Sequence, residues 1–124
     1  MGKSILRDKS YLFAIRIVKL SQLLQTDKKE FVLSKQVLRS GTAIGALVRE
    51  AEFAQSKADF IHKLHIALKE ANETEYWLSI LFDTNYIEKS LSESLIADCK
   101  ELIALLVSSI KTLKTKNEKL KVEN

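Results

Sequence analysis

The stretch that decides the fold runs from Arg39 to Phe82 and reads RSGTAIGALVREAEFAQSKADFIHKLHIALKEANETEYWLSILF. In its second half, apolar or small residues recur at alternating intervals of four and three: Phe60, Leu64, Ala67, Ala71, Thr74, Leu78 and Leu81. This heptad spacing keeps one side of a helix toward a partner helix. Ser56 can accept a bond from the N–H three residues on, and the carboxylate of Asp59 favours the positive end of the helix dipole. We therefore predict a helix at about 57–82.

A second helix, at about 34–54, precedes this one, with Ser34 as its expected N-cap. Gly41 and Gly45 lower helix propensity, and the simplest explanation of two helical glycines is a local flaw or kink. Their spacing of four, however, puts both on one face, where a neighbouring backbone can approach closely. Because a conflict with propensity usually has a packing or functional reason, we predict close helix packing at Gly41 and Gly45.

Two segments of the stretch, RSGTAIGALVREA and FIHKLHIALKEANETEYWL, resemble the small bacterial family encoded in intervening sequences of 23S ribosomal RNA genes. That family includes the accessory variability determinant of diversity-generating retroelements. The resemblance covers nearly the whole chain and is strongest over residues 37–82. This sequence departs from the family at two positions: Ala43 stands where the family often has Ser, and Leu47 stands where it often has Asn. If those polar residues make contacts in the family, apolar residues replace them here.

The resemblance implies an antiparallel four-helix bundle, commonly a ring of five subunits, with no known catalytic activity. Nucleic-acid binding is known for the retroelement branch of the family, so RNA or DNA is an implied partner. A reverse transcriptase would be a second partner if this chain belongs to that branch. The implied assembly is thus a homopentamer.

The composition fits one all-α domain spanning residues 1–124. Hydrophobic residues make up 46% of the chain, proline is absent and glycine occurs three times, so one core can form and little interrupts helices. The single cysteine, Cys99, excludes an internal disulfide and fits a reducing cytoplasm. A signal peptide needs an uninterrupted apolar run near the N-terminus, and Arg7 breaks that run here. No stretch approaches the roughly 18 uncharged apolar residues that a membrane span needs. We expect a cytoplasmic protein that makes no contact with a membrane.

Two further helices, at about 4–25 and 92–114, complete an up-down-up-down bundle, because short loops favour antiparallel neighbours. In the loop between the third and fourth helices, Asn85 is the expected left-handed residue. The charged residues 115–124 are expected to form a flexible basic tail. The first helix has a wide apolar arc, which fits either a place deep between two neighbours or contact with another subunit. The arc joins a stripe of Phe13, Ile17, Leu20 and Leu24 to a second of Tyr11, Ile15 and Val18.

This topology gathers positive charge at one end of the bundle. The segments 1–12, 46–65 and 107–124 hold eleven basic and six acidic residues, whereas the rest of the chain holds nine and ten. Clustered Lys and Arg attract phosphate backbones without reading sequence, although a lysine-rich end can equally be a solvated surface. The candidate nucleic-acid-binding residues are Lys3, Arg7, Lys9, Arg49, Lys57, Lys63, Lys111, Lys114 and Lys116.

No group of residues predicts catalysis, a metal or a cofactor. His62 and His65 lie three apart, but a di-iron bundle needs two Glu-x-x-His pairs and further inward glutamates. Cys99 is expected to be a buried, inert thiol. The acidic residues from Glu70 to Glu75 are best explained by ion pairs with a neighbouring helix or by a solvated face. Beside the heptad seam, a half-buried polar stripe should form hydrogen bonds across a helix pair or a subunit boundary, through His65, Asn72 and Glu75.

Two hypotheses about function follow from the sequence. The first is a non-enzymatic, oligomeric four-helix bundle that binds RNA or a ribonucleoprotein partner through its basic end. The second is a structural or protein-interaction module that assembles through apolar helix faces and has no nucleic-acid role.

Overall fold

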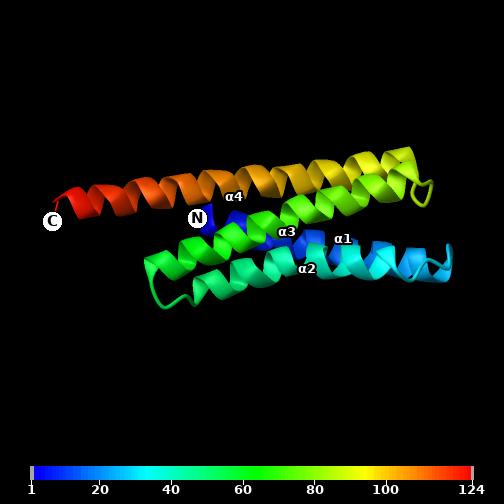
Figure 1. Ribbon diagram of the computed structural model, residues 1–124, viewed down its shortest axis with the longest axis horizontal. Coiled ribbons are helices and arrows are strands. Elements are labelled where there is room, and N and C mark those ends of the chain that lie inside the picture. The colour runs from blue at the N-terminus through cyan, green and yellow to red at the C-terminus, as the bar shows by residue number, and fades with distance from the viewer. Residues whose placement is uncertain (1, 124) are drawn as a thin grey trace.

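Four helices, each antiparallel to the next, make up the part of the chain that the structure describes. The computed structural model describes the backbone of residues 2–123 and the side chains of residues 5–116, 118 and 119. The helices run up and down in turn (Figure 1), confirming the predicted all-α, up-down-up-down bundle. In chain order they are α1 (Gly2–Thr26), α2 (Leu33–Glu52), α3 (Lys57–Asp83) and α4 (Lys89–Glu123).

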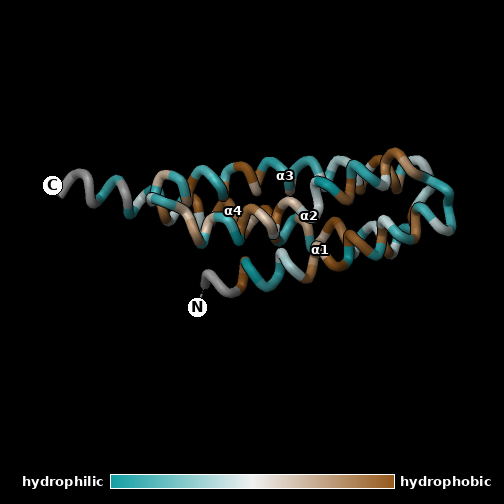
Figure 2. The backbone as a smooth tube through the Cα atoms, turned by 90° about the horizontal axis from the view of Figure 1, so that it is seen from below, coloured by the Kyte–Doolittle hydropathy of each residue, from teal (hydrophilic) through white to brown (hydrophobic). Residues whose placement is uncertain are grey.

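The core lies along the shared axis of the four helices. Each helix packs against the next in sequence, and α4 also meets α1, through the smallest of the four contacts. Figure 2 shows hydrophobic and hydrophilic residues alternating along the helices. The heptad seam of α3 is buried except at Phe60, which is half-buried. Over the described residues, none of these helices is both long and apolar enough to cross a membrane.

The start of α3 and the loop after it follow the predictions. The Oγ of Ser56 accepts a hydrogen bond from the backbone N–H of Asp59 at 3.1 Å, and the Oδ2 of Asp59 accepts one from the N–H of Gln55 at 3.3 Å. These reciprocal bonds satisfy N–H groups that no helical carbonyl can reach. Asn85 has a φ of 67°, the predicted left-handed conformation.

The start of α2 differs from the prediction. The carboxylate of Glu30 accepts hydrogen bonds from the N–H of Ser34 at 2.8 Å and from the N–H of Val32 at 3.3 Å. Ser34 lies inside the helix, fully buried, and its Oγ has no hydrogen-bond partner among the described residues. The predicted N-cap at Ser34 is therefore wrong: a carboxylate reaches two N–H groups at the positive end of the helix dipole, which a single hydroxyl does not.

Helix α4 is longer at both ends than the predicted 92–114. It begins at Lys89 and continues to Glu123, so the backbone of residues 115–123 is helical rather than a flexible tail. This segment contains no proline or glycine and is rich in Lys and Glu, which favour helix. The last turns of α4 therefore extend past the other three helices (Figure 1).

Candidate nucleic-acid interface

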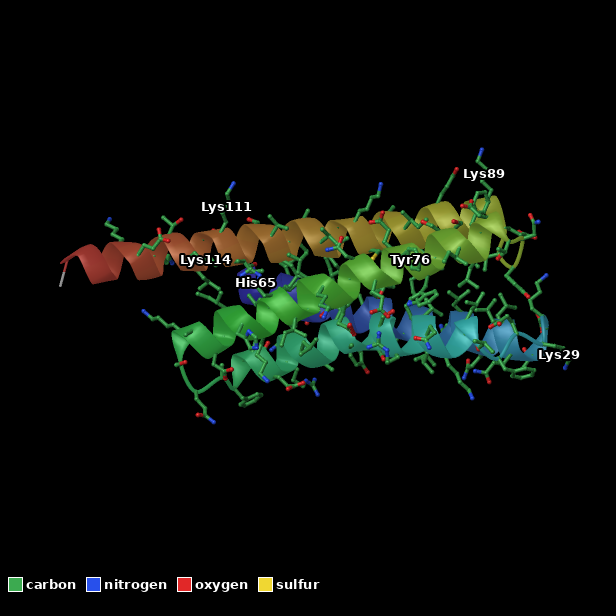
Figure 3. The ribbon with its side chains drawn as sticks, in the orientation of Figure 1. Lys29, His65, Tyr76, Lys89, Lys111 and Lys114 are labelled. Atoms are coloured by element: carbon green, nitrogen blue, oxygen red, sulfur yellow. The ribbon has the colours of Figure 1, made fainter. Side chains whose placement is uncertain are left out.

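One end of the bundle gathers the start of α1, the turn between α2 and α3, and the C-terminal part of α4 (Figure 1). All four helices line a hollow of about 570 Å³ there, through Leu6, Val48, Leu64 and Leu113 among others. We call this the basic end and define it as residues 1–12, 46–65 and 107–124. In Figure 3, Lys111 and Lys114 lie on this side of the molecule, whereas Lys29 and Lys89 lie at the opposite end.

Three of the candidate basic residues face carboxylates. The Nε of Arg7 lies 3.5 Å from Asp8 Oδ1, and its Nη1 lies 3.9 Å from Glu52 Oε1. The other pairs are Lys9 with Glu101 at 3.0 Å and Lys63 with Glu50 at 3.4 Å. Most of these side chains are well exposed, and ion pairs in such settings contribute little, about 0–1 kcal/mol. A phosphate could therefore displace the carboxylates at small cost.

The other candidates on described residues have exposed side chains with no ion pair to a described carboxylate: Arg49, Lys57, Lys111, Lys114 and Lys116. They come from the last turn of α2, the first turn of α3 and the C-terminal part of α4. Lys57 and Lys116 line a common hollow of about 460 Å³. The side chain of the remaining candidate, Lys3, lies outside the described residues. These five cations are therefore exposed without a described carboxylate partner.

In the middle of the bundle, charged side chains of α2 and α3 pair with one another. The guanidinium of Arg39 in α2 donates to Glu70 Oε2 at 2.7 Å and also to Glu73, both in α3. The hydrogen bond to Glu70 is the main cause that raises the pKa of Arg39. The pKa of Glu73 is lowered, chiefly because Trp77 Nε1 donates to its Oε2 at 3.0 Å. These acidic residues therefore pair with the neighbouring helix, as expected, and stabilise the bundle.

Gly41 and Gly45 lie where α2 meets α1. A Cβ added at Gly41 would come within 2.8 Å of Ile17 Cγ1, and one added at Gly45 would come within 3.2 Å of the carbonyl oxygen of Ser10. The first contact is closer than real Cβ atoms come, so a larger residue at Gly41 would force Ile17 or the helices to shift, and the second is tight enough that the backbone at Ser10 would have to give by a few tenths of an ångström. The glycines set the distance between α1 and α2 just below the basic end.

The polar stripe on α3 forms no hydrogen bond to another helix among the described residues. His65 and Asn72 are exposed and Glu75 is half-buried. The side-chain amide of Asn72 donates to the carbonyl of Leu68 in its own helix at 3.1 Å. The predicted bonds across a helix pair are therefore absent from the described part of the subunit, and contact of these residues across a subunit boundary stays a prediction.

Cys99 and the candidate metal ligands were the reactive side chains that the sequence offered. Cys99 is buried with its Sγ 3.2 Å from the carbonyl oxygen of Ala71, and burial raises its pKa to about 12, so the thiol stays protonated and unreactive. No three side chains of the His, Cys, Asp and Glu types come together as metal ligands within the described residues.

A groove on the outer side of α1 and α2 was missed by the sequence interpretation. It has a volume of about 260 Å³, and Arg7, Tyr11 and Arg49 line it together with small residues of α2. Phe53, the residue that caps the C-terminus of α2, is 80% exposed. The signal in the sequence was the spacing of four between Arg7 and Tyr11, which places both on one helix face, together with the same spacing between Arg49 and Phe53.

Comparison with known proteins identifies relatives of this chain. The family model described as 23S rRNA-intervening sequence protein matches residues 3–108. A protein of unknown function from the S23 ribosomal protein family of Bacteroides thetaiotaomicron VPI-5482 has a crystal structure with a TM-score of 0.88 and 58% sequence identity, and the match covers 90% of this chain and 99% of that one. No curated protein matches. The resemblance inferred from the sequence is thereby confirmed.

Proposed function

This chain belongs to the 23S rRNA-intervening sequence protein family, and we propose that it is a non-enzymatic, oligomeric protein that binds RNA, or RNA together with a protein partner, through its basic end. The observation that carries the proposal is the group of exposed cations without a described carboxylate partner, contributed by three segments distant in sequence. Clustered cations of this kind bind phosphate backbones by charge and shape.

The opposite end of the bundle supports this choice by contrast. It also carries lysines, including Lys28, Lys29 and Lys89, but these alternate with acidic residues. The acidic neighbours are Asp27, Glu30, Asp83 and Glu88. Because charges of both signs cancel over a distance comparable with the Debye length of about 8 Å, that end attracts phosphate weakly. The positive field is therefore concentrated at the basic end.

Self-association would strengthen this field. The outer face of α1 exposes Leu12, Ile15 and Val18 within two turns of helix, and a contiguous apolar face of this kind marks an interaction surface. We propose that a second copy of the chain packs against the Leu12 side of this face and leaves Tyr11 open, in a pentamer as the family resemblance implies. A ring repeats the basic end in every subunit, so an RNA would meet several clusters at once.

RNA binding can be measured by fluorescence anisotropy with a labelled, structured RNA between 50 and 200 mM salt. The triple variant Lys111→Ala, Lys114→Ala, Lys116→Ala should weaken binding at least tenfold and flatten the salt dependence, because each lost phosphate contact removes roughly 0.7 to 0.9 from the slope of log K against log salt. The matched control is Lys28→Ala, Lys29→Ala, Lys89→Ala at the opposite end, which should leave the affinity within twofold of the wild type. Absence of binding at low salt, or equal losses in the two variants, would overturn the proposal.

A second candidate function is a protein-interaction module without a nucleic-acid role. The exposed apolar face of α1 favours it, since that face needs no nucleic acid to explain it. Light scattering and the ratio of absorbance at 260 and 280 nm separate the two candidates: an oligomer that carries no nucleic acid at low salt favours the module. A strict monomer at tens of micromolar contradicts the oligomeric part of both.

The cellular partner follows from where the coding sequence lies. A position inside a ribosomal RNA gene would point to that RNA, and a position beside a reverse transcriptase would point to that enzyme. In either case we propose a cytoplasmic protein, because a single unpaired thiol suits a reducing compartment.

A further inference from the structure

Two strongly exposed aromatic side chains lie at the basic end, and Phe31 and Tyr76 are exposed elsewhere on the bundle. Phe53 is 80% exposed and Tyr11 is 61% exposed. Scattered exposed apolar residues are ordinary on protein surfaces, but each of these rings follows an arginine by four residues. On α1 this spacing places ring and guanidinium on one helix face, and Phe53 is the residue that caps the C-terminus of α2. The pairs are Arg7 with Tyr11 on α1 and Arg49 with Phe53 at the end of α2.

Three of these four side chains line one groove. Arg7, Tyr11 and Arg49 border the hollow of about 260 Å³ between α1 and α2. Its other lining residues are small, namely Ala14, Thr42, Gly45 and Ala46. Because these side chains are small, the groove leaves space for a flat ring against Tyr11 and for a phosphate beside the two guanidiniums. Arg7 also faces Asp8 and Glu52, at 3.5 and 3.9 Å, which are long contacts that a phosphate can replace.

The antiparallel arrangement of α1 and α2 fixes the order of the four groups. Gly45 of α2 lies against Ser10 of α1, so Tyr11 is near the level of Gly45. Phe53 lies eight residues beyond Gly45, which corresponds to about 12 Å at the helical rise of 1.5 Å per residue. The order along the axis is therefore Phe53, then the two arginines side by side, then Tyr11: a cationic centre with an aromatic ring on either side.

We infer that this aromatic–arginine strip, formed by Phe53, Arg49, Arg7 and Tyr11, binds single-stranded RNA, with unpaired bases stacked on the rings and phosphates between the guanidiniums. Aromatic side chains bind bases that have left the helical stack, whereas the bases of a duplex are stacked on one another and out of reach. This inference rests on the proposed function and narrows its ligand to unpaired segments. The lysines of α4 add charge and favour either form of RNA.

The test compares a labelled 12-nucleotide single-stranded RNA with a duplex of the same sequence. The double variant Tyr11→Ala, Phe53→Ala should lose at least tenfold in affinity for the single strand, since one stacked base contributes about 1–3 kcal/mol, and should bind the duplex within twofold of the wild type. Both side chains are exposed, so circular dichroism and the thermal midpoint should stay unchanged. The matched controls are Tyr11→Phe and Phe53→Tyr, which keep the rings and should keep the affinity. Light scattering should show that the variants keep the wild-type mass.

Several results would overturn the inference. If the double variant binds the single strand as the wild type does, or if Phe53→Leu retains full affinity, base stacking is wrong. If the wild type binds duplex and single strand equally while the triple lysine variant weakens both, the proposed function stands and the inference fails. If the wild type binds neither probe at low salt, the proposed function itself fails, and the inference with it.

Discussion

The middle of the bundle and its basic end treat the same kinds of polar residue in opposite ways. In the middle, Arg39 donates to two carboxylates of α3, and the buried hydroxyls of Ser40 and Thr74 lie in hydrogen-bond contact at 3.0 Å. At the basic end, cations such as Lys57 and Lys111 are exposed and have no described carboxylate partner. Polar groups that satisfy one another hold the helices together but have nothing left for a ligand. Cations surrounded by water contribute little to folding and remain available, so stability and binding are separated along the axis.

The largest loss of stability should come from the middle, at Gly41. Replacing it by valine would place two methyl groups inside the contact with Ile17, which is already 2.8 Å from the position of an added Cβ. Overpacking of this kind should lower the free energy of unfolding by about 3 kcal/mol, measured by urea denaturation. The control is Ala46→Val, an exposed position on the same helix, which should change it by less than about 0.5 kcal/mol. Equal effects at the two positions would contradict the close contact of α1 with α2.

A smaller loss is expected at Arg39. The variant Arg39→Met leaves the carboxylate of Glu70, whose side chain is only 12% exposed, without its partner. An unsatisfied and largely buried charged group costs about 1–3 kcal/mol, and the exposure of Arg39 itself places the expected loss near the lower limit. Urea denaturation should show this loss, whereas Lys35→Met on the same helix should have none. If both variants unfold alike, the ion pair does not stabilise the bundle.

A still smaller effect, and one that depends on pH, is expected at Trp77. Because the folded state lowers the pKa of Glu73 below its ordinary 4.5, this carboxylate stabilises the fold above about pH 4.5 and loses its contribution as the pH falls through the lowered value. Trp77→Phe removes the main cause of that shift. Its free energy of unfolding should be about 1 kcal/mol lower than that of the wild type at neutral pH, and the gap should narrow in acid. If the difference in free energy of unfolding between the wild type and Trp77→Phe instead grows in acid, the pKa of Glu73 is not lowered by folding.

The smallest effect on stability is expected at the basic end. The triple variant Lys111→Ala, Lys114→Ala, Lys116→Ala should unfold within about 0.5 kcal/mol of the wild type. The same variant is expected to weaken the binding of both single-stranded and duplex RNA. The same urea denaturation measures it. A loss of several kcal/mol would mean that these lysines serve the fold, and the separation between the two regions would no longer hold.

Features that depend on neighbours in sequence were predictable. The heptad seam of α3, the cap formed by Ser56 and the left-handed Asn85 each follow from a few consecutive residues. The start of α2 was not predicted, because the carboxylate of Glu30, outside the helix, accepts from the N–H groups of Val32 and Ser34, and the helix then begins before Ser34. Nor was the end of α4, where composition suggested disorder but nothing in the segment interrupts a helix.

The composition of the site was only partly predictable. The sequence located the basic end, because helix order alone brings its three segments together. It could not divide the cations into paired and unpaired ones: Lys9 meets Glu101 across 92 positions of sequence, and that contact depends on the register of α1 against α4. The aromatic–arginine strip was missed for the same reason, since its two halves lie on different helices and become neighbours only through the contact of Gly45 with α1.

The setting of Cys99 has a practical consequence for spectroscopy. Its thiol, enclosed beside Ala71 and with a pKa of about 12, should not react with maleimides at neutral pH while the protein is folded. A cysteine introduced on the surface would then be the single labelling position, without first removing the native one. Spin labels or fluorophores attached in this way could report distances between subunits and between each subunit and a bound strand.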